Sequence, residues 1–296
     1  MGVGIRRIIL QILAYTLYAL LAFIVFVYVL FPYKELQQRL MEWASRDGVQ
    51  LSLTRLRPAF PPGLRAEGIR LQVDQFSPSD ATMSIETLRV HPEWLALLSR
   101  KMQWRFEAGL YSGRLEGEAR STKVEGVPLW EVKTRFTDLD MTQYALLRQD
   151  GKAFLRGRLG GDATASLTSD GQMQDGSLNL RSQSVALVSM PGWRLQLPRE
   201  IVCDTLQGEL KTPARQASTV AFTCQGKDLF IEARGTMAWK TPLVDSLLNM
   251  RWQVRSEEAY KPEMDLLANV LRRRPDRRGE IIFRLQGPLR QLRTGA

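Results

Sequence analysis

Residues 60–73, "FPPGLRAEGIRLQV", join an abrupt chain break to a regular strand pattern. Proline has no backbone N–H to give to a sheet, and glycine adopts backbone angles that other residues avoid, so the Pro-Pro-Gly run ends regular structure. The end of the stretch alternates apolar and polar residues, as a strand with one apolar and one wet face does. The stretch therefore predicts a corner that ends the strand containing Leu51 and Leu53 and starts a fresh one.

The same two-residue period recurs along most of the chain. Clear examples are "MQWRFEAGL" at residues 102–110 and "RGEIIFRLQG" at residues 278–287. Alternation of this kind is typical of antiparallel strands, and about a dozen such segments can be recognised. The sequence predicts a mainly β protein with a few short helices. By itself the pattern leaves open whether the strands form a closed barrel, a sandwich or an open curved sheet.

A short motif, glycine followed by any residue and then an apolar one, recurs in these segments. Its irregular spacing argues against a true solenoid repeat. We expect each glycine to mark a turn or a bulge. The copies of this motif begin at Gly113, Gly157, Gly176, Gly208 and Gly235.

The N-terminal region carries a long apolar run. Residues 8–31 contain no charge, and a helix needs about 20 such residues to cross a bilayer. The alternative is a cleaved signal peptide, whose apolar core is shorter (about 7–15 residues) and ends at small residues. Here the run ends in bulky Val29, Leu30 and Phe31, which favours an uncleaved anchor. Because Arg6 and Arg7 precede it, the N-terminus is expected inside and the body outside.

The rest of the chain divides simply. Leu36, Leu40 and Trp43 recur at helical spacing after Pro32, and Gly48 is a suitable helix stop. The predicted organisation is a cytoplasmic tail at 1–7, a transmembrane helix at 8–31, a juxtamembrane helix at 32–48 and a β-rich domain at 49–296.

Charge and cysteine content point to partners and compartment. The formal charge is +10, which serves either solubility alone or attraction to an anionic membrane surface or an acidic partner. A basic surface patch is predicted in "RRRPDRR", with a solvated loop as the alternative; its members are Arg272, Arg273, Arg274, Arg277 and Arg278. No nucleic-acid-binding motif is present. The two cysteines, Cys203 and Cys224, share strand faces with apolar residues, so they form either a disulfide or two separate buried thiols.

Residues that carry catalytic chemistry are sparse. His91 is the one histidine in the chain, so a histidine-based triad or metal site is not expected. Two carboxylate pairs fall on one strand face each, Asp138 with Asp140 and Glu116 with Glu118, but outward acids on amphipathic strands are common. We expect no catalytic residue, no metal and no cofactor.

Several segments taken together resemble a known family. They are "FPPGL" with "GIRL" at residues 60–71, "TLRVHPEWLALLSRKMQWRFEAGLYSGRLEGEA" at residues 87–119, and "GEIIFRLQGPLRQL" near the C-terminus. With the single N-terminal span, they resemble the type II secretion system protein N (GspN) family, and in strand pattern the AsmA-like envelope proteins.

The resemblance implies a function without catalysis. A member of the secretion family is expected in the bacterial inner membrane with its body in the periplasm, as an accessory component that contacts other parts of the type II secretion machine. The AsmA-like pattern implies a curved antiparallel sheet, an open or taco-like groove with an apolar lining, and hence lipid binding or transfer. The family supplies no catalytic residues.

Overall fold

The computed structural model describes most of the β-rich region and part of the N-terminal region. The described residues are 11–19, 22–23, 25–26, 30–46, 49–59, 63–73, 82–94, 96, 102–124, 127–143, 148–149, 152–153, 155–168, 173–190, 195–213, 217–227, 229–240, 245–256, 264–265, 268–269, 274–276, 279–288 and 293–295.

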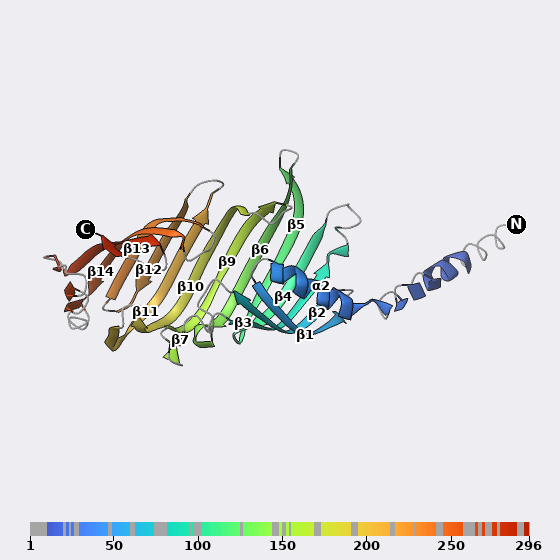
Figure 1. Ribbon diagram of the computed structural model, residues 1–296, viewed down its shortest axis with the longest axis horizontal. Helices are drawn as coiled ribbons and strands as arrows, with labels where there is room; N and C mark the ends of the chain where they lie inside the picture. Colours follow the sequence, from blue (N-terminus) through green and yellow to red (C-terminus); the bar gives the residue numbers. More distant parts are fainter. Residues whose placement is uncertain are drawn as a thin grey trace.

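One 14-stranded sheet forms the body of the protein (Figure 1). Its strands follow the chain order, every described pairing is antiparallel, and β7 (Arg148–Gln149) with β8 (Lys152–Ala153) forms a separate small ribbon. The mainly β, antiparallel prediction is confirmed. The strands of the sheet are β1 (Val49–Ala59), β2 (Gly63–Val73), β3 (Thr82–Pro92), β4 (Gln103–Leu110), β5 (Gly113–Val124), β6 (Val127–Asp140), β9 (Leu155–Thr168), β10 (Met173–Met190), β11 (Leu195–Thr212), β12 (Ser218–Gln225), β13 (Leu229–Ala238), β14 (Leu247–Ser256), β15 (Glu280–Pro288) and β16 (Arg293–Gly295).

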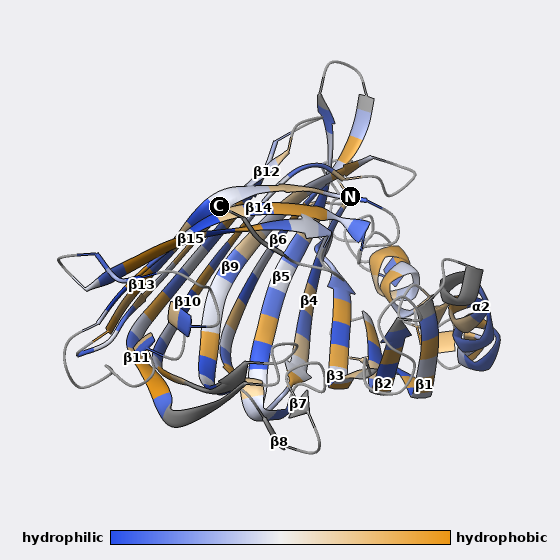
Figure 2. Cartoon of the chain, turned by 60° about the vertical axis from the view of Figure 1, so that its left-hand side comes forward, coloured by the Kyte–Doolittle hydropathy of each residue, from blue (hydrophilic) through white to orange (hydrophobic). Residues whose placement is uncertain are grey.

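The sheet is open, because β1 lies at one edge and β16 at the other. The two chain ends lie at opposite ends of an elongated molecule (Figure 1). Turned by 60°, the same sheet is seen to twist and curve, with orange apolar and blue polar bands crossing its strands (Figure 2).

The corner expected at residues 60–73 separates β1 from β2. β1 ends at Ala59, β2 begins at Gly63, and these two residues are register partners of one antiparallel pair. A Cβ on Gly63 would lie 2.4 Å from the carbonyl oxygen of Val90 in β3, so a side chain has no room at this end of the hairpin. Residues 60–62 themselves lie outside the described residues.

Helix α2 (Tyr33–Arg46) lies against the N-terminal end of the sheet, within the range predicted for a juxtamembrane helix. Its Leu36 and Met41 pack with Leu53 and Ile69, and the Gln37 side-chain amide donates a 2.8 Å hydrogen bond to the Leu53 carbonyl. Within the predicted transmembrane helix at 8–31, residues 11–19, 22–23, 25–26 and 30 are described and are helical, and residues 8–10, 20–21, 24 and 27–29 lie outside the described residues. Among the residues that are described, no helix is long and apolar enough to cross a membrane.

Strand register divides the sheet into an apolar and a polar face. Register partners lie on the same face, so partner residues can be followed sideways from strand to strand. One such line crosses from β1 to β15 without meeting a polar side chain, and we call it the apolar row. Its members are Leu56, Ala66, Leu88, Ala108, Leu115, Phe136, Gly161, Leu180, Gly208, Phe222, Ala233, Trp252 and Phe283.

The residues next to the apolar row in each strand form a second line on the opposite face. This line, the charged row, also crosses from β1 to β15 and is mostly ionic. Its members are Arg57, Arg65, Arg89, Glu107, Glu116, Arg135, Asp162, Asn179, Glu209, Ala221, Arg234, Arg251 and Arg284. The contrast between the two rows is what makes the sheet amphipathic across its full width.

Interior glycines accept large side chains from neighbouring strands. A Cβ on Gly117 would lie 2.4 Å from the ring Cζ of Phe106, and one on Gly208 would lie 3.3 Å from the Cβ of Leu180. Gly208 and Gly235 sit in regular pairings of β11 and β13, so the expectation of a turn or bulge was wrong there. It was right at Gly113, which follows a turn, and at Gly157, which has a φ of 137° beside a register shift.

Candidate functional surfaces

The apolar face is covered by helical residues at its two ends. At the N-terminal end α2 packs on β1 and β2. At the C-terminal end Met264 and Ala268 pack on β14 and β15, in a cluster that includes the fully buried Ile281. These two contacts close the ends of the apolar face with an ordinary hydrophobic core.

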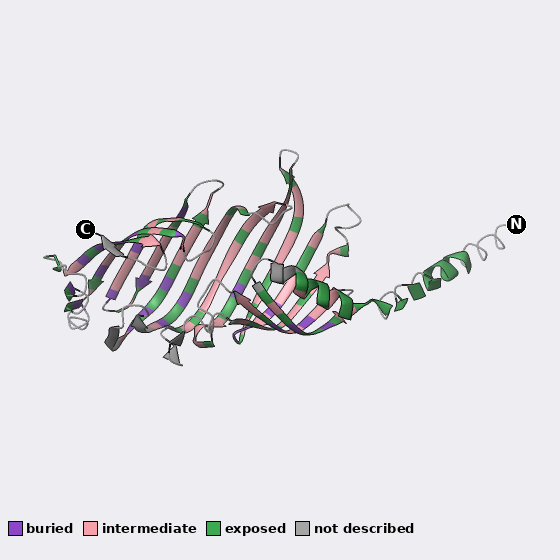
Figure 3. Cartoon of the chain, viewed as in Figure 1, coloured by how far each residue is buried: buried purple, intermediate pink, exposed green. Residues whose placement is uncertain are grey.

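Between these ends much of the apolar face is only half-buried, although Ala108 and Phe136 are buried (Figure 3). Trp104 and Met173, near one margin of the face, are 37% and 48% exposed. A sheet face that carries leucine and aromatic side chains normally packs on a second layer. The half-buried apolar residues of this middle region are Phe106, Leu115, Val132, Ala163, Leu178, Leu180, Leu210, Val220 and Phe222.

Backbone irregularities interrupt the alternation of buried residues in two strands, β2 and β10. Gly68 has a φ of 64° and Ser184 a φ of 58°. At each of them the apolar pattern slips by one residue, so that Ser182 and Val185 are both buried. Irregularities of this kind increase the local twist and bend of a strand.

The predicted cysteine pair lies at this bend. Cys203 of β11 and Cys224 of β12 are joined by a disulfide, with the Cα atoms 5.4 Å apart. Both are buried, in a cluster with Val185 and Leu206. Cys203 is the register partner of Val185, one residue beyond Ser184. The bond therefore ties β11 to β12, beside the irregularity in the neighbouring strand β10.

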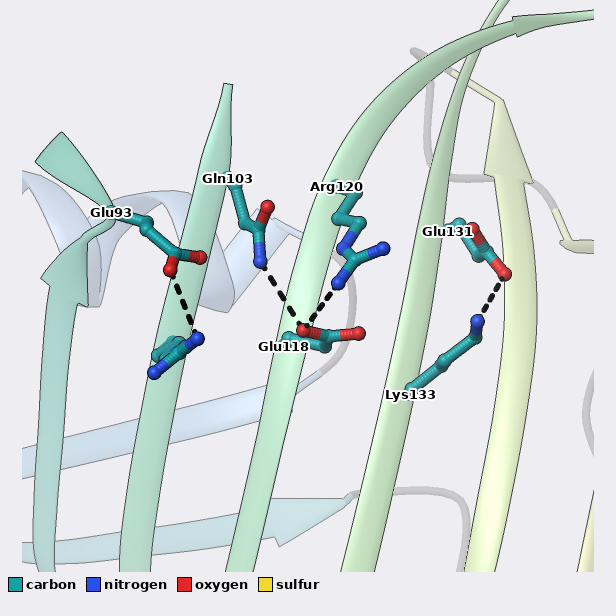
Figure 4. A network of polar contacts seen from close by, with 7 residues as sticks. Glu93, Gln103, Glu118, Arg120, Glu131 and Lys133 are labelled. Carbon is teal, nitrogen blue, oxygen red and sulfur yellow. Dashed lines mark hydrogen bonds and ion pairs between the residues drawn. The ribbon is translucent and has the colours of Figure 1, made fainter. Parts of the chain in front are cut away.

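The polar face carries ion pairs along and between strands. Glu93 pairs with Arg105, and Glu118 accepts hydrogen bonds from both Gln103 and Arg120 (Figure 4). The Lys133 ammonium lies 2.9 Å from the Glu131 carboxylate. These side chains are substantially solvent-exposed, so each pair contributes only about 0–1 kcal/mol to stability. Their main effect is to keep one face of a large open sheet solvated.

Three of the four carboxylates considered for catalysis, Glu116, Glu118 and Asp140, are engaged in structural contacts. Glu116 pairs with Arg114, and Glu118 with Arg120. The Thr142 hydroxyl and backbone N–H both donate to Asp140, at 2.6 and 2.9 Å, and these bonds hold the pKa of Asp140 below its ordinary value. A general acid needs a raised pKa, so Asp140 has the opposite property and serves instead to cap the short helix η1 (Met141–Gln143).

The polar face is hollowed over β10 to β13. The hollow has a volume of about 600 Å³ and lies where Ala221 interrupts a run of long side chains, among them Asn179, Arg181, Gln207 and Arg234. A second hollow of about 520 Å³ shares Arg181 and Gln207 with it. Both are shallow and open, and the first is mainly polar, unlike the enclosed apolar pockets that usually hold small ligands.

Most of the predicted basic patch cannot be placed. Arg274 is exposed, whereas Arg272, Arg273, Arg277 and Arg278 lie outside the described residues. Sequence reasoning missed three arginines of the charged row, Arg234, Arg251 and Arg284, which adjacent strands bring side by side. They are far apart in the sequence, and only the strand register reveals that they are neighbours.

No group of side chains able to hold a metal ion is found within the described ranges. Comparison with protein-family models, with curated proteins and with solved structures gives no match. The two faces of the sheet, rather than a similarity to a known protein, are therefore the basis for a functional proposal.

Proposed function

We propose that this protein is a non-catalytic, membrane-anchored protein of the bacterial envelope that binds lipid acyl chains on the apolar face of its sheet. The observation that carries the proposal is the apolar row, which crosses from β1 to β15 and of which Leu115, Leu180 and Phe222 are only half-buried between the two covered ends. Burying apolar surface contributes about 25 cal/mol per Å². When an acyl chain lies on this face, apolar surface of the chain and apolar surface of the sheet are both removed from water, and both contribute to binding.

The glycines of the apolar face support an extended apolar ligand. Because Phe106 lies over Gly117 and Leu180 over Gly208, these large side chains lie along the sheet instead of standing up from it. The result is a low, continuous apolar surface, suited to a flexible chain. Lipid binding of this kind is also what the AsmA-like strand pattern implies.

One pair of adjacent residues in β9 tests the proposal. Ala163 lies half-buried on the apolar face, and Thr164 is exposed on the polar face. We expect the full chain, purified in mild detergent, to carry phospholipid that extraction and mass spectrometry detect. Ala163→Glu should remove most of it, because a carboxylate cannot share an apolar surface with an acyl chain.

Thr164→Glu is the matched control, since it adds the same charge one residue away on the other face. Its lipid content should equal that of the unaltered chain, and both variants should keep the strand signal in circular dichroism. If the folded protein carries no lipid, or if both variants lose lipid equally, the proposal is wrong.

The second candidate function is an accessory role in type II protein secretion, through periplasmic contacts with other components of that machine. It is supported by the resemblance at residues 60–71 and 87–119, segments that fall on the β1–β2 hairpin and on β3, β4 and β5. A scaffold of this type needs no catalytic group. Localisation in the inner membrane, with the N-terminus cytoplasmic and the body periplasmic, belongs to both proposals.

The secretion proposal is tested by deleting the gene in a strain that depends on type II secretion. Export of folded exoproteins should fall and return when the gene is restored. Unchanged export under those conditions would contradict the role in secretion and leave lipid binding untouched. Complementation with Ala163→Glu then separates the two proposals, since a purely scaffolding body would tolerate the added carboxylate.

A further inference from the structure

The charged row has an uneven distribution of charge. In its middle, Arg135 has an acid on either side, Glu116 in β5 and Asp162 in β9. Opposite charges directly across two strands stabilise a sheet, and like charges destabilise it. Around Arg135 the row therefore follows the arrangement expected of a face whose only task is to be soluble.

The C-terminal end of the row departs from that arrangement. Arg234 of β13 is the register partner of Arg251 of β14, which is in turn the partner of Arg284 of β15. Three guanidinium groups thus stand on adjacent strands, about 4.8 Å from one strand to the next. We call these residues the arginine trio.

Nearby acids compensate only part of this charge. Glu232 pairs with Arg234 and Glu280 with Arg255. Among the residues that the structure describes, no carboxylate pairs with Arg251 or with Arg284, and both are exposed. Two cations therefore remain uncompensated where the fold places them side by side, whereas Arg135 in the same row has an acid on either side.

Exposed apolar side chains flank the trio on the same face. Ile282 stands two residues before Arg284 in β15 and is 41% exposed, and Leu247 of β14 is 42% exposed. Both alternate in phase with the arginines and not with the buried residues of these strands. Cationic side chains with apolar neighbours on one exposed surface are typical of proteins that rest on anionic membranes.

We propose that the arginine trio, with Ile282 and Leu247, is a docking surface for a bilayer containing anionic phospholipids. Arginine binds phosphate through a planar fork of donors, and a basic residue near an anionic bilayer strengthens binding about fivefold. The surface lies on the polar face, at the end of the molecule farthest from the N-terminus (Figure 1). It is separate from the acyl-chain surface and does not depend on it.

The test uses the full chain held in nanodiscs of neutral phosphatidylcholine, so that its own apolar segment is occupied. These nanodiscs are mixed with vesicles rich in phosphatidylglycerol or with vesicles of phosphatidylcholine alone, and binding is measured by co-flotation. We expect binding to the anionic vesicles only, and its loss at high salt, because exposed charges are screened. The double substitution Arg251→Gln with Arg284→Gln should weaken binding about 25-fold.

Stability distinguishes a docking surface from a structural one. Removing two uncompensated cations should leave the melting temperature unchanged or slightly higher while binding falls. Arg135→Gln, in the middle of the same row, is the matched control: it should leave vesicle binding unchanged and lower stability slightly. Equal binding of the double variant and the unaltered chain, or binding to an acidic protein but not to anionic vesicles, would overturn the proposal.

Discussion

The ring of Phe136 in β6 lies over the backbone of Gly161 in β9: a Cβ on that glycine would stand 2.7 Å from the ring Cζ. The two residues are register partners on the apolar face. A ring that covers a neighbouring glycine shields its backbone and adds cross-strand contact. Gly161 is therefore needed to leave room for the ring of Phe136, and not because its backbone adopts angles that other residues avoid.

Gly161→Ala should lower the free energy of unfolding by about 1–3 kcal/mol, because the added methyl group meets both the ring and the carbonyl oxygen of Asn179. Gly160→Ala is the control: its Cβ would have only ordinary contacts, the nearest at 3.4 Å. Urea unfolding followed by circular dichroism measures both. Equal stability of the two variants would show that the ring does not need the glycine.

The disulfide gives a second expectation. Cys203 and Cys224 are 21 residues apart, and closing a loop of that length stabilises a protein by about 3 kcal/mol. Reduction, or replacement of both cysteines by alanine, should lower the free energy of unfolding by about that amount. The reductant should have no effect on the double variant. A cysteine-free chain as stable as the native one would show that the bond adds nothing to the packing of the two strands.

The strands could be predicted from the sequence, but their lateral relations could not. Alternation identified the segments that became β1, β2, β4 and β15, and the Pro-Pro-Gly run gave the β1–β2 corner. Gly208 was misread as a turn or bulge because its purpose depends on Leu180 in the neighbouring strand. The apolar row and the arginine trio depend in the same way on strand register. A one-residue slip of one strand would move its side chains to the opposite face of the sheet.

Asp140 should make stability depend on acid pH. Its pKa is lowered, first by the Thr142 hydroxyl, below the ordinary value of 3.8. A carboxylate whose folded pKa is depressed stabilises the protein above the unfolded pKa, and this contribution is lost as pH falls through the folded pKa. Stability profiles of the native chain and Asp140→Asn should therefore differ near neutral pH and converge below about pH 4.

The effect should be small, because Asp140 is well hydrated. Asp138, close by in β6, has an exposed side chain. Asp138→Asn is a suitable control and should follow the native profile more closely. If the profile of Asp140→Asn ran parallel to the native one at every pH, the hydrogen bonds from Thr142 would not be acting on the ionised carboxylate.

The bend at Ser184 offers a stabilising substitution. Ser184 has a φ of 58°, a conformation that costs an L-residue roughly 1–2 kcal/mol and glycine little. Ser184→Gly should therefore raise the free energy of unfolding by up to about 1 kcal/mol, after allowance for the greater freedom of glycine in the unfolded chain. Gln183→Gly, one residue earlier and outside the left-handed region, should lower stability instead. Opposite signs from these two adjacent substitutions would locate the strain at Ser184, where the apolar pattern of β10 changes phase. A loss of stability from both would place the cause of the bend elsewhere.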